Sequence, residues 1–294
     1  PDSEDIIKCG SYTGDGTTNG TKEVTLGFEP QWILTKRSSG TDNWHICDVI
    51  RGQTTDGGTA RLRANTSAAE SSNFGAVPTA TGFKLYSDNT NGATFIYVAI
   101  RRPDMSTPTS ATDVFAIDNA QATSGSGPAF VSNFPVDMLL EKQPSTTGSW
   151  PIAARLQGDQ YLVTDATSAE TTGSSITWDY MNGAFEPFNV SPSYQAWMWK
   201  RARGYFDVVA EPIASNQMSG PASSSYNPSH NLGVVPEMIW VKDRDNSNDW
   251  AVYHSALGTS KKLVLNSNAA ESSSSWAVAA DNFNYYQFGN STGN

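Results

Sequence analysis

The sequences LGFEPQWILTKR at residues 26–37 and LGVVPEMIWVKD at 232–243 decide the fold, because they are two copies of one pattern. They share the Leu-Gly pair, the Pro, the Ile and the Lys, and SNFPVDMLLEKQ at 132–143 is a more divergent copy between them. A Trp follows each copy, at Trp44, Trp150 and Trp250. Internal repetition is the signature of a tandem array of structural units. The chain is therefore predicted to contain three related domains.

A second landmark follows each Trp. It is the hexapeptide NTSAAE at 65–70, DATSAE at 165–170 or NSNAAE at 266–271. Large aromatic residues that recur with a fold are usually packing residues, so the three Trp side chains are predicted to face a core, with a ligand platform as the alternative. The Lys of the pattern recurs at Lys36, Lys142 and Lys242. It is predicted to lie over apolar neighbours with its ammonium at water or at a carboxylate, for which the hexapeptide Glu is a candidate.

Short runs rich in β-branched and aromatic residues divide the first copy. They are EVTLGF at 23–28, QWILTK at 31–36, WHICDV at 44–49, GFKLYS at 82–87 and TFIYVAI at 94–100. Turn-forming residues separate these runs, and no long window has apolar residues at helical spacing. Regularly spaced short strands are typical of a sandwich or barrel. The chain is therefore predicted to be all-β, with one lectin-like or jelly-roll-like β-sandwich of about 100 residues per copy.

The copies also set the predicted domain boundaries. They are a first sandwich at 1–103, a divergent second at 104–203 and a third at 204–294. The first two copies close with FIYVAIRR at 95–102 and YQAWMWKR at 194–201, and the third lacks a counterpart of this strand. Either these residues are a piece of a longer polypeptide or another subunit supplies the strand, because open sheet edges are usually covered.

Composition excludes several classes of protein. The formal net charge is −10 and the isoelectric point is near 4.7, so a nucleic-acid partner is not expected, because phosphate binding needs clustered Lys and Arg. No apolar run is long enough for a membrane span, and PDSEDIIK at the start is not a signal peptide. Membrane insertion is therefore not predicted. Cys9 and Cys47 are predicted to be reduced, partly buried thiols, with a single bridge as the alternative.

Motifs for catalysis are missing from the sequence. No GxSxG, HExxH, GxxxxGKS/T or GxGxxG follows a strand. The histidines are His45, His230 and His254, and the second copy has none. Carboxylates for glycoside hydrolysis need only meet in space, but no Asp or Glu has an aromatic, repeated context. The chain is therefore predicted not to be an enzyme, with a glycan depolymerase as the alternative.

The loop KDRDNSNDW at 242–250 has the hard oxygen donors that calcium prefers. The candidate ligands are Asp243, Asp245, Asn246, Asn248 and Asp249. The matching loops KRSSGTDNW and KQPSTTGSW lack most of these groups, which favours an ordinary hairpin tip as the alternative. Calcium is thus the single cofactor considered, and none is predicted as required.

Exposed aromatic rings beside amide and carboxylate side chains are typical of carbohydrate-binding surfaces, because an apolar ring can stack on a sugar face. Tyr285 and Tyr286, in DNFNYYQFGN at 281–290, have this context. The alternative is a strand in which one ring faces the core and the other faces outward.

The block LGVVPEMIWVKDRDNSNDWAVYHSALG at 232–258, followed by KLVLNSNAAESSSSW, resembles the repeat of tail-fibre and other virion structural proteins of marine bacteriophages, cyanophages especially. The first copy, with NWHICDVIRG and RLRANTSAAE, is similar, and the second departs most. Together the copies cover nearly the whole chain. The resemblance implies a virion surface component made of concatenated β-sandwiches, and it transfers no catalytic residue.

Three functions follow from this resemblance and from composition. The first is a non-enzymatic virion structural protein, a tail-fibre or spike segment that positions or contacts a bacterial surface receptor, with other virion proteins and copies of itself as partners, a trimer being favoured. The second is a capsid or tail decoration or connector without a receptor. The third is a carbohydrate-binding or depolymerising module. The resemblance favours the first, with a bacterial surface glycan as a candidate receptor and the virion surface as the location.

Overall fold

The computed structural model describes most of the chain. The described residues are 6–18, 20–51, 59–102, 107–120, 127–173, 176–178, 180–184, 193–210 and 228–285. They divide into two compact units, the first made mainly of residues 1–104 and the second mainly of the remaining residues. Each unit is described by itself. The boundary between a second and a third domain stays a prediction.

The all-β prediction is confirmed, since every sheet is antiparallel and the helical elements among the described residues are three short 3₁₀ turns. The strands of the first unit are β1 (Ile7–Thr13), β2 (Lys22–Thr25), β3 (Pro30–Arg37), β4 (Trp44–Asp48), β5 (Thr59–Arg63), β6 (Ser71–Phe74), β7 (Ala76–Thr79), β8 (Gly82–Leu85) and β9 (Thr94–Arg101). Those of the next stretch are β10 (Phe115–Asn119), β11 (Phe130–Val131), β12 (Met138–Lys142), β13 (Pro151–Ala154), β14 (Gln160–Val163), β15 (Thr171–Thr172), β16 (Gly183–Ala184) and β17 (Gln195–Trp199). The last are β18 (Met238–Val241), β19 (Ala251–His254), β20 (Lys261–Val264), β21 (Ser272–Ser273), β22 (Trp276–Val278) and β23 (Phe283–Tyr285), and the 3₁₀ turns are η1 (Ala111–Asp113), η2 (Arg155–Gln157) and η3 (Ser255–Leu257).

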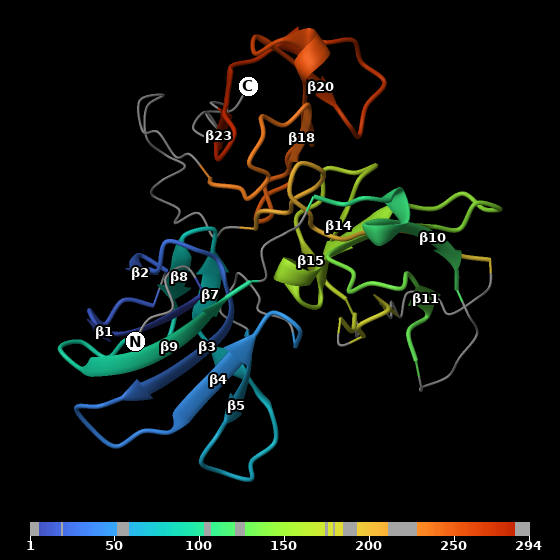
Figure 1. Cartoon of the computed structure of the whole chain (residues 1–294). Helices are drawn as coiled ribbons and strands as arrows, with labels where there is room; N and C mark the ends of the chain where they lie inside the picture. Colours follow the sequence, from blue (N-terminus) through green and yellow to red (C-terminus); the bar gives the residue numbers. More distant parts are fainter. Residues whose placement is uncertain are drawn as a thin grey trace. The chain divides into compact units, whose positions relative to one another are not determined.

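Two sheets build the first unit (Figure 1). One has the order β1-β9-β3-β4-β5-β6 and the other the order β2-β8-β7. A single core takes residues from both, including Ile33 and Phe95 from the larger sheet and Val24 and Phe83 from the smaller. Alternation places these side chains on one face of each strand. The other face of the larger sheet, here called the outer face, therefore points away from this core.

The second unit repeats this strand order. Its larger sheet runs β10-β17-β12-β13-β14-β15, so that the last long strand, β17, lies between the first and second strands, as β9 does between β1 and β3. Leu139 and Met198 belong to its core, together with Phe130 from the small β11-β16 sheet. A third sheet, β18-β19-β20-β21, has the order of β3-β4-β5-β6 and no counterpart of β9 among the residues described.

The Leu-Gly landmark has a conformational cause. Gly27, Asn133 and Gly233 lie at the same position of the pattern and have φ of 88°, 67° and 68°. This left-handed region suits Gly and is tolerated by Asn. The divergent second copy therefore keeps the turn although it loses the Leu-Gly pair.

The Trp and hexapeptide landmarks recur because they bond to each other. The backbone N–H groups of Trp44, Trp150 and Trp250 donate to the side-chain oxygens of Asn65, Asp165 and Asn266, each at 2.9 Å. The first hexapeptide residue thus fixes the start of the strand that follows the hairpin. The shared feature is this backbone contact, and it does not require the indole ring to be buried.

The indole rings have different surroundings in the three copies. Trp44 is 38% exposed, Trp150 is half-buried and Trp250 is buried. The prediction that the whole Trp series faces a core is therefore wrong for Trp44. This ring lies on the outer face, which the hydrophobic pattern of one strand cannot distinguish from the core face.

Cys9 and Cys47 are not joined by a disulfide, and Cys9 is exposed while Cys47 is buried. No helix in the described part of the chain is long and apolar enough to cross a membrane.

Candidate functional site

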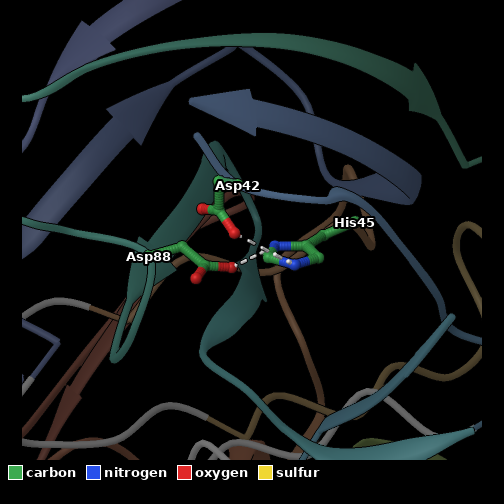
Figure 2. Close-up of side chains that lie close together, drawn as sticks. All are labelled: Asp42, His45 and Asp88. Atoms are coloured by element: carbon green, nitrogen blue, oxygen red, sulfur yellow. Dashed lines mark hydrogen bonds and ion pairs between the residues drawn. The ribbon is translucent and has the colours of Figure 1, made fainter. Parts of the chain in front are cut away.

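A group of polar side chains in the first unit surrounds His45 (Figure 2). The buried imidazole has Nδ1 at 2.6 Å from Oδ2 of Asp88 and Nε2 at 3.8 Å from Oδ1 of Asp42. Arg61 Nη1 lies 3.7 Å from the same Asp88 oxygen. We refer to Asp42, His45, Arg61 and Asp88 as the His45 cluster.

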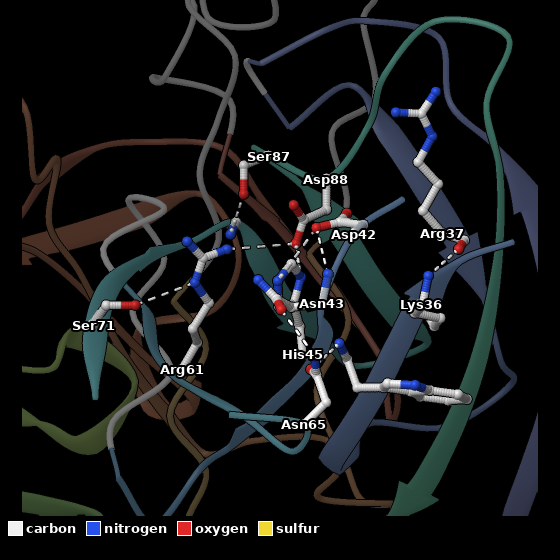
Figure 3. A network of polar contacts seen from close by, with 12 residues as sticks. Lys36, Arg37, Asp42, Asn43, His45, Arg61, Asn65, Ser71, Ser87 and Asp88 are labelled. Carbon is white, nitrogen blue, oxygen red and sulfur yellow. Dashed lines mark hydrogen bonds and ion pairs between the residues drawn. The ribbon is translucent and has the colours of Figure 1, made fainter. Parts of the chain in front are cut away.

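Three segments of the chain bring these groups together (Figure 3). Asp42 precedes β4, His45 lies on β4 and Arg61 on β5, while Asp88 follows β8. Asp88 has a positive φ of 50°, which an Asp adopts more readily than most residues, and its carbonyl accepts a hydrogen bond from the hydroxyl of Tyr12 at 3.2 Å. The cluster therefore ties the loop after β8 to β4, β5 and β1.

Burial raises the pKa of the Tyr12 hydroxyl, and the negative charge of Asp88 raises it further. Tyr12 therefore stays protonated throughout the physiological range and remains a hydrogen-bond donor. Its ring stacks on Phe95 at a centroid distance of 5.1 Å, which places the polar contact directly at the edge of the apolar core.

The geometry of the cluster suits an ion pair. A ring protonated only at Nδ1 satisfies Asp88, and a doubly protonated ring donates toward both carboxylates. Arg61 adds a second positive group at Asp88, and its Nε donates to Ser71 Oγ at 3.2 Å. Two carboxylates and two basic groups so arranged compensate one another in a largely desolvated place.

A metal ion fits this donor set by chemical type, since imidazole and carboxylate groups bind zinc and related ions. The three groups Asp42, His45 and Asp88 lie within 4.8 Å of one another. Two ligand atoms on one tetrahedral ion are separated by about 3.4 Å, whereas Nδ1 and Asp88 Oδ2 are at hydrogen-bond distance, 2.6 Å. With Arg61 also facing Asp88, the arrangement fits a hydrogen-bonded ion pair better than a metal centre.

The sequence contained only part of the signal for this cluster. His45 stood out because it follows Trp44, but the corresponding residues are Pro151 and Ala251, so the His is not part of the repeated pattern. Its partner Asp88 lies in a loop after β8 and carries no motif. A close approach of loops from distant parts of the sequence could not be predicted from spacing.

The other two histidines bond to the backbone. His254 Nδ1 accepts from the N–H of Ala256 at 3.1 Å and caps η3, and His230 Nδ1 accepts from the N–H of Leu232 at 3.3 Å. His230 Nε2 also donates to the carbonyl of Ala279 at 3.2 Å, so this ring joins two segments that are distant in the sequence.

The calcium candidates form a hairpin tip that satisfies its own polar groups. Asp243 accepts from the backbone N–H groups of Asp245 and Asn246 and from the side-chain amides of Asn246 and Asn248. Asp249 accepts instead from Asn266, at 2.8 Å. The five side chains therefore do not converge on one point.

Lys242 supplies positive charge within this tip. Its ammonium donates to the carbonyl oxygens of Asp243 at 2.6 Å and Asn246 at 3.0 Å. Partial burial lowers its pKa, while Asp243 and Asp249 act in the opposite direction. Two backbone oxygens of the tip that could coordinate a calcium ion are thus already bonded to the Lys242 ammonium.

The recurring Lys has the same role in each copy. Lys36 donates to the carbonyl of Arg37 and Lys142 to that of Gly148, as Lys242 does in the third hairpin. The hexapeptide Glu bonds elsewhere. Its partners are Arg51 for Glu70, Arg244 for Glu170 and Lys261 for Glu271. The suggested pairing of these Lys and Glu residues is therefore wrong, because the Lys closes its own hairpin.

Tyr285 is buried, in contrast to what a sugar platform needs. Its ring stacks on Trp276 at a centroid distance of 4.3 Å within the core of the third sheet, and its hydroxyl accepts from Lys262 at 3.1 Å. Tyr285 is therefore a packing residue. Tyr286 lies outside the described residues.

An exposed ring beside amide groups lies instead on the first unit. Trp44 is on the outer face, where Asn65 accepts from the backbone N–H of Trp44 and donates to Asn43 Oδ1 at 3.0 Å. Ile96 and Leu62 are also exposed on this face. Lys36 lies between Trp44 and Ile96 across the sheet, so this face combines apolar side chains with a lysine and with amide groups, and the exposed indole can stack against a sugar.

A joint connects the second and third sheets. Trp250 packs with Ile152 and Leu162 on the outer side of the second sheet, and its Nε1 donates to the carbonyl of Val163 at 2.9 Å. Arg244 and Glu170, both largely buried, form a two-pronged ion pair with N–O distances of 2.9 and 2.6 Å. Such pairs fix orientation as well as distance, so the two sheets are held in a defined arrangement.

One further buried carboxyl lies away from the His45 cluster. Glu141, on β12, faces the core of the second unit, and neither carboxyl oxygen has a hydrogen-bond partner. Burial raises its pKa from 4.5 to about 8. Ala196 lies opposite it on β17, so its immediate cross-strand neighbour is apolar.

These features define an all-β protein whose polar groups serve mainly to fix hairpins, loops and a joint between sheets. The chain belongs to the family of a domain of unknown function, DUF7483, whose model matches residues 3–103 and 122–294. No curated protein and no solved structure matches the chain.

Proposed function

We propose that this chain is a non-enzymatic structural segment of a virion, part of a tail fibre or spike, that positions or contacts a receptor on a bacterial surface. The joint between the second and third sheets is the observation that carries the proposal. A spacer must keep successive units in register, and a buried ion pair together with an inserted Trp does so. The resemblance of 232–258 to virion repeats supports the same role.

The internal use of polar groups also supports a structural role. The recurring Lys, Asn and Asp side chains bond to backbone groups of their own copy. Residues that complete backbone hydrogen bonds are occupied in the folded protein, and such residues maintain a scaffold. The repeated landmarks are therefore best explained as scaffold residues, and receptor contact belongs to surfaces that differ between copies.

The outer face around Trp44 is the surface proposed to contact the receptor. It combines an exposed indole with the amide of Asn43, while Asn65 is already bonded to the Trp44 backbone and to Asn43. Indole rings bind sugar faces through apolar contact, and the amide nitrogen of Asn43 can donate a hydrogen bond. The proposed ligand class is a bacterial surface glycan.

The test is binding of the whole chain, displayed multivalently, to an array of bacterial surface glycans, because avidity makes weak single-site binding measurable. We expect saturable binding that Trp44→Ala abolishes. Tyr205→Ala is the matched control, since Tyr205 is exposed to a similar degree and lies in the second unit. Its binding should equal that of the unchanged chain.

Each other outcome counts against this proposal. Absence of binding by a folded sample favours a connector or decoration without a receptor. Release of reducing sugar from an envelope glycan identifies a depolymerase instead. If Trp44→Ala leaves glycan binding unchanged, the chain still contacts a receptor, but through a different surface.

A further inference from the structure

Lys36 places a positive charge on the outer face beside the exposed ring of Trp44. It lies opposite Trp44 of β4 on one side and opposite Ile96 of β9 on the other, so the three side chains form one row across the sheet. Cβ atoms of directly opposite residues are about 5 Å apart. The chain as a whole is acidic, with a net charge of −10, so its composition does not account for a basic group at this position.

The Lys36 ammonium has more donors than its hairpin bond requires. It donates to the carbonyl oxygen of Arg37 at 2.5 Å (Figure 3). An ammonium carries three donors, and this bond takes one of them. Asp48, which alternation places on the same face of β4, is bonded to Arg51 at 2.6 Å, so its negative charge is compensated locally. An anionic group of a ligand can therefore bind at Lys36.

The combination of this Lys with an exposed indole distinguishes the first copy from the other two. In the second copy Lys142 lies over the Trp150 ring, 5.5 Å from its centroid, and that ring stacks on Trp197. In the third copy Trp250 is buried in the joint. The Lys is thus common to all copies because it closes the hairpin, whereas the exposed ring beside it belongs to the first copy.

Hydroxyl groups form a second row next to the first. Thr94 lies on β9 two positions before Ile96, hence on the same face, and opposite Thr13 of β1. Both threonines are exposed. The hydroxyl of Ser38 donates to the Thr94 carbonyl at 3.1 Å, so it lies beside them. Side-chain hydroxyls donate and accept hydrogen bonds, which suits the hydroxyl groups of a sugar.

These two rows favour one kind of sugar over another. A sugar ring that stacks on Trp44 directs the substituents at its edge toward the neighbouring side chains. A carboxylate attached directly to a pyranose ring then comes within reach of the ammonium of Lys36. The contact of an ammonium with a carboxylate is a charge-assisted hydrogen bond, which is stronger than a bond between neutral groups. A neutral sugar offers the ammonium no such partner.

We propose that the surface around Trp44 selects saccharides that carry a carboxylate on the pyranose ring, the class of the uronic acids. Trp44 binds the face of the ring, and Lys36 binds the carboxylate. Lys36 is thus the residue that determines specificity. This inference rests on the proposed function, because it names the ligand class of the same surface.

The test compares two forms of the same bacterial glycans on one array. In one set the uronic acid carboxyl groups are intact, and in the other they are reduced to primary alcohols, which keeps every linkage and removes the charge. Neutral and phosphate-bearing glycans are included, and the whole chain is displayed multivalently. We expect binding to the intact set to be at least about tenfold stronger than to the reduced set. The difference should shrink at high salt concentration.

Variants of Lys36 assign this preference to the ammonium. Lys36→Gln should lower binding of the intact set to the level of the reduced set, while Lys36→Arg should keep the preference, because a guanidinium also binds carboxylates. Lys142→Gln is the matched control, since it removes the corresponding hairpin bond in the second copy, and it should change nothing. The comparison of the two glycan sets needs no variant, so it decides the question even if Lys36→Gln does not fold.

Three results would overturn this inference and leave the proposed function standing. They are equal binding of the intact and reduced sets that Trp44→Ala abolishes, a preference for the intact set that a folded Lys36→Gln retains, and stronger binding to phosphate-bearing glycans than to uronic acids. Absence of binding to every glycan counts against the proposed function itself, and the inference fails with it.

Discussion

Glu141 is the residue whose chemistry conflicts most with its position. The equivalent core-facing residues in the other copies are Thr35 and Val241, and neither is ionisable. A carboxylate without hydrogen bonds is costly in an apolar environment, so the protonated form is favoured there. The raised pKa of about 8 follows from this burial.

Glu141 therefore makes stability depend on pH. The folded protein binds the proton more tightly than the unfolded chain, whose Glu has a pKa near 4.5. The contribution to stability is fully present below that value and is lost as the pH rises toward about 8, at up to about 1.4 kcal/mol per pH unit. Glu141→Val should raise the melting temperature at pH 8 and flatten the pH dependence between pH 5 and 8, measured by calorimetry. An unchanged slope in this variant would contradict the assignment.

The two carboxylates of the His45 cluster should differ in their importance. Asp88→Asn weakens the 2.6 Å contact with Nδ1 and the pairing with Arg61, so a loss of about 2–4 kcal/mol of unfolding free energy is expected. Asp42→Asn, whose carboxylate is 3.8 Å from the ring and more exposed, should cost less than about 1 kcal/mol. Urea denaturation measures both, and equal losses would show that the two carboxylates hold the ring alike.

At the scale of the elements, the hexapeptide acts through its first residue. Asp165 and Asn266 accept the N–H of Trp150 and Trp250 and so hold the strand start after each hairpin. Asn266 also donates to Asp249, which joins the hexapeptide to the hairpin tip. The spacing between the Trp and this residue is similar in the copies because the hydrogen bond connects the start of one strand with the end of the adjacent strand.

Removal of this contact should act like the loss of a helix cap. Asn266→Ala leaves the N–H of Trp250 without its side-chain acceptor, and a loss of about 1 kcal/mol is expected. Asp249→Ala is the matched control, because it removes the contact with the Asn266 amide and keeps the acceptor for the N–H of Trp250. Thermal unfolding compares the two variants, and an equal loss for both would assign the effect to the Asp249 contact.

At the scale of the whole molecule, the joint determines whether the second and third sheets unfold together. Trp250→Ala removes a buried ring from the contact with Ile152 and Leu162, at a cost of about 3–5 kcal/mol. We expect the calorimetric transition of the second unit to split in two. Trp44→Ala removes an exposed indole at the equivalent position and should leave the transition unchanged. A single transition in Trp250→Ala would mean that the Trp250 ring is not needed to couple the sheets.

The Arg244–Glu170 pair can be separated from the apolar part of the joint by a double-mutant cycle. Removal of either partner alone leaves a largely buried charge without its counter-ion. The losses of unfolding free energy of the two single variants should therefore add up to more than the loss of the double variant. This pair links the hexapeptide of one copy to the hairpin of the next, a contact that the alignment of copies alone did not indicate.

The sequence by itself determined the all-β class and the runs that form β2, β3, β4, β8 and β9, but it did not indicate β1, β5, β6 or β7. The five predicted runs depend on local properties, namely β-branched and aromatic content between turn-forming residues. The sequence also indicated that the Trp and hexapeptide landmarks belong together, although it did not give the hydrogen bond between them.

Only the tertiary structure decided which side chains meet. It buried Tyr285 against Trp276, left Trp44 exposed and brought Asp88 to His45. In the hairpin at 242–250, the carboxylate of Asp243 accepts hydrogen bonds from groups of the same hairpin. The physical reason is that burial and contact depend on which face of a strand is covered and on loops that approach from distant parts of the chain. Alternation along one strand defines two faces but does not say which of them another element will cover.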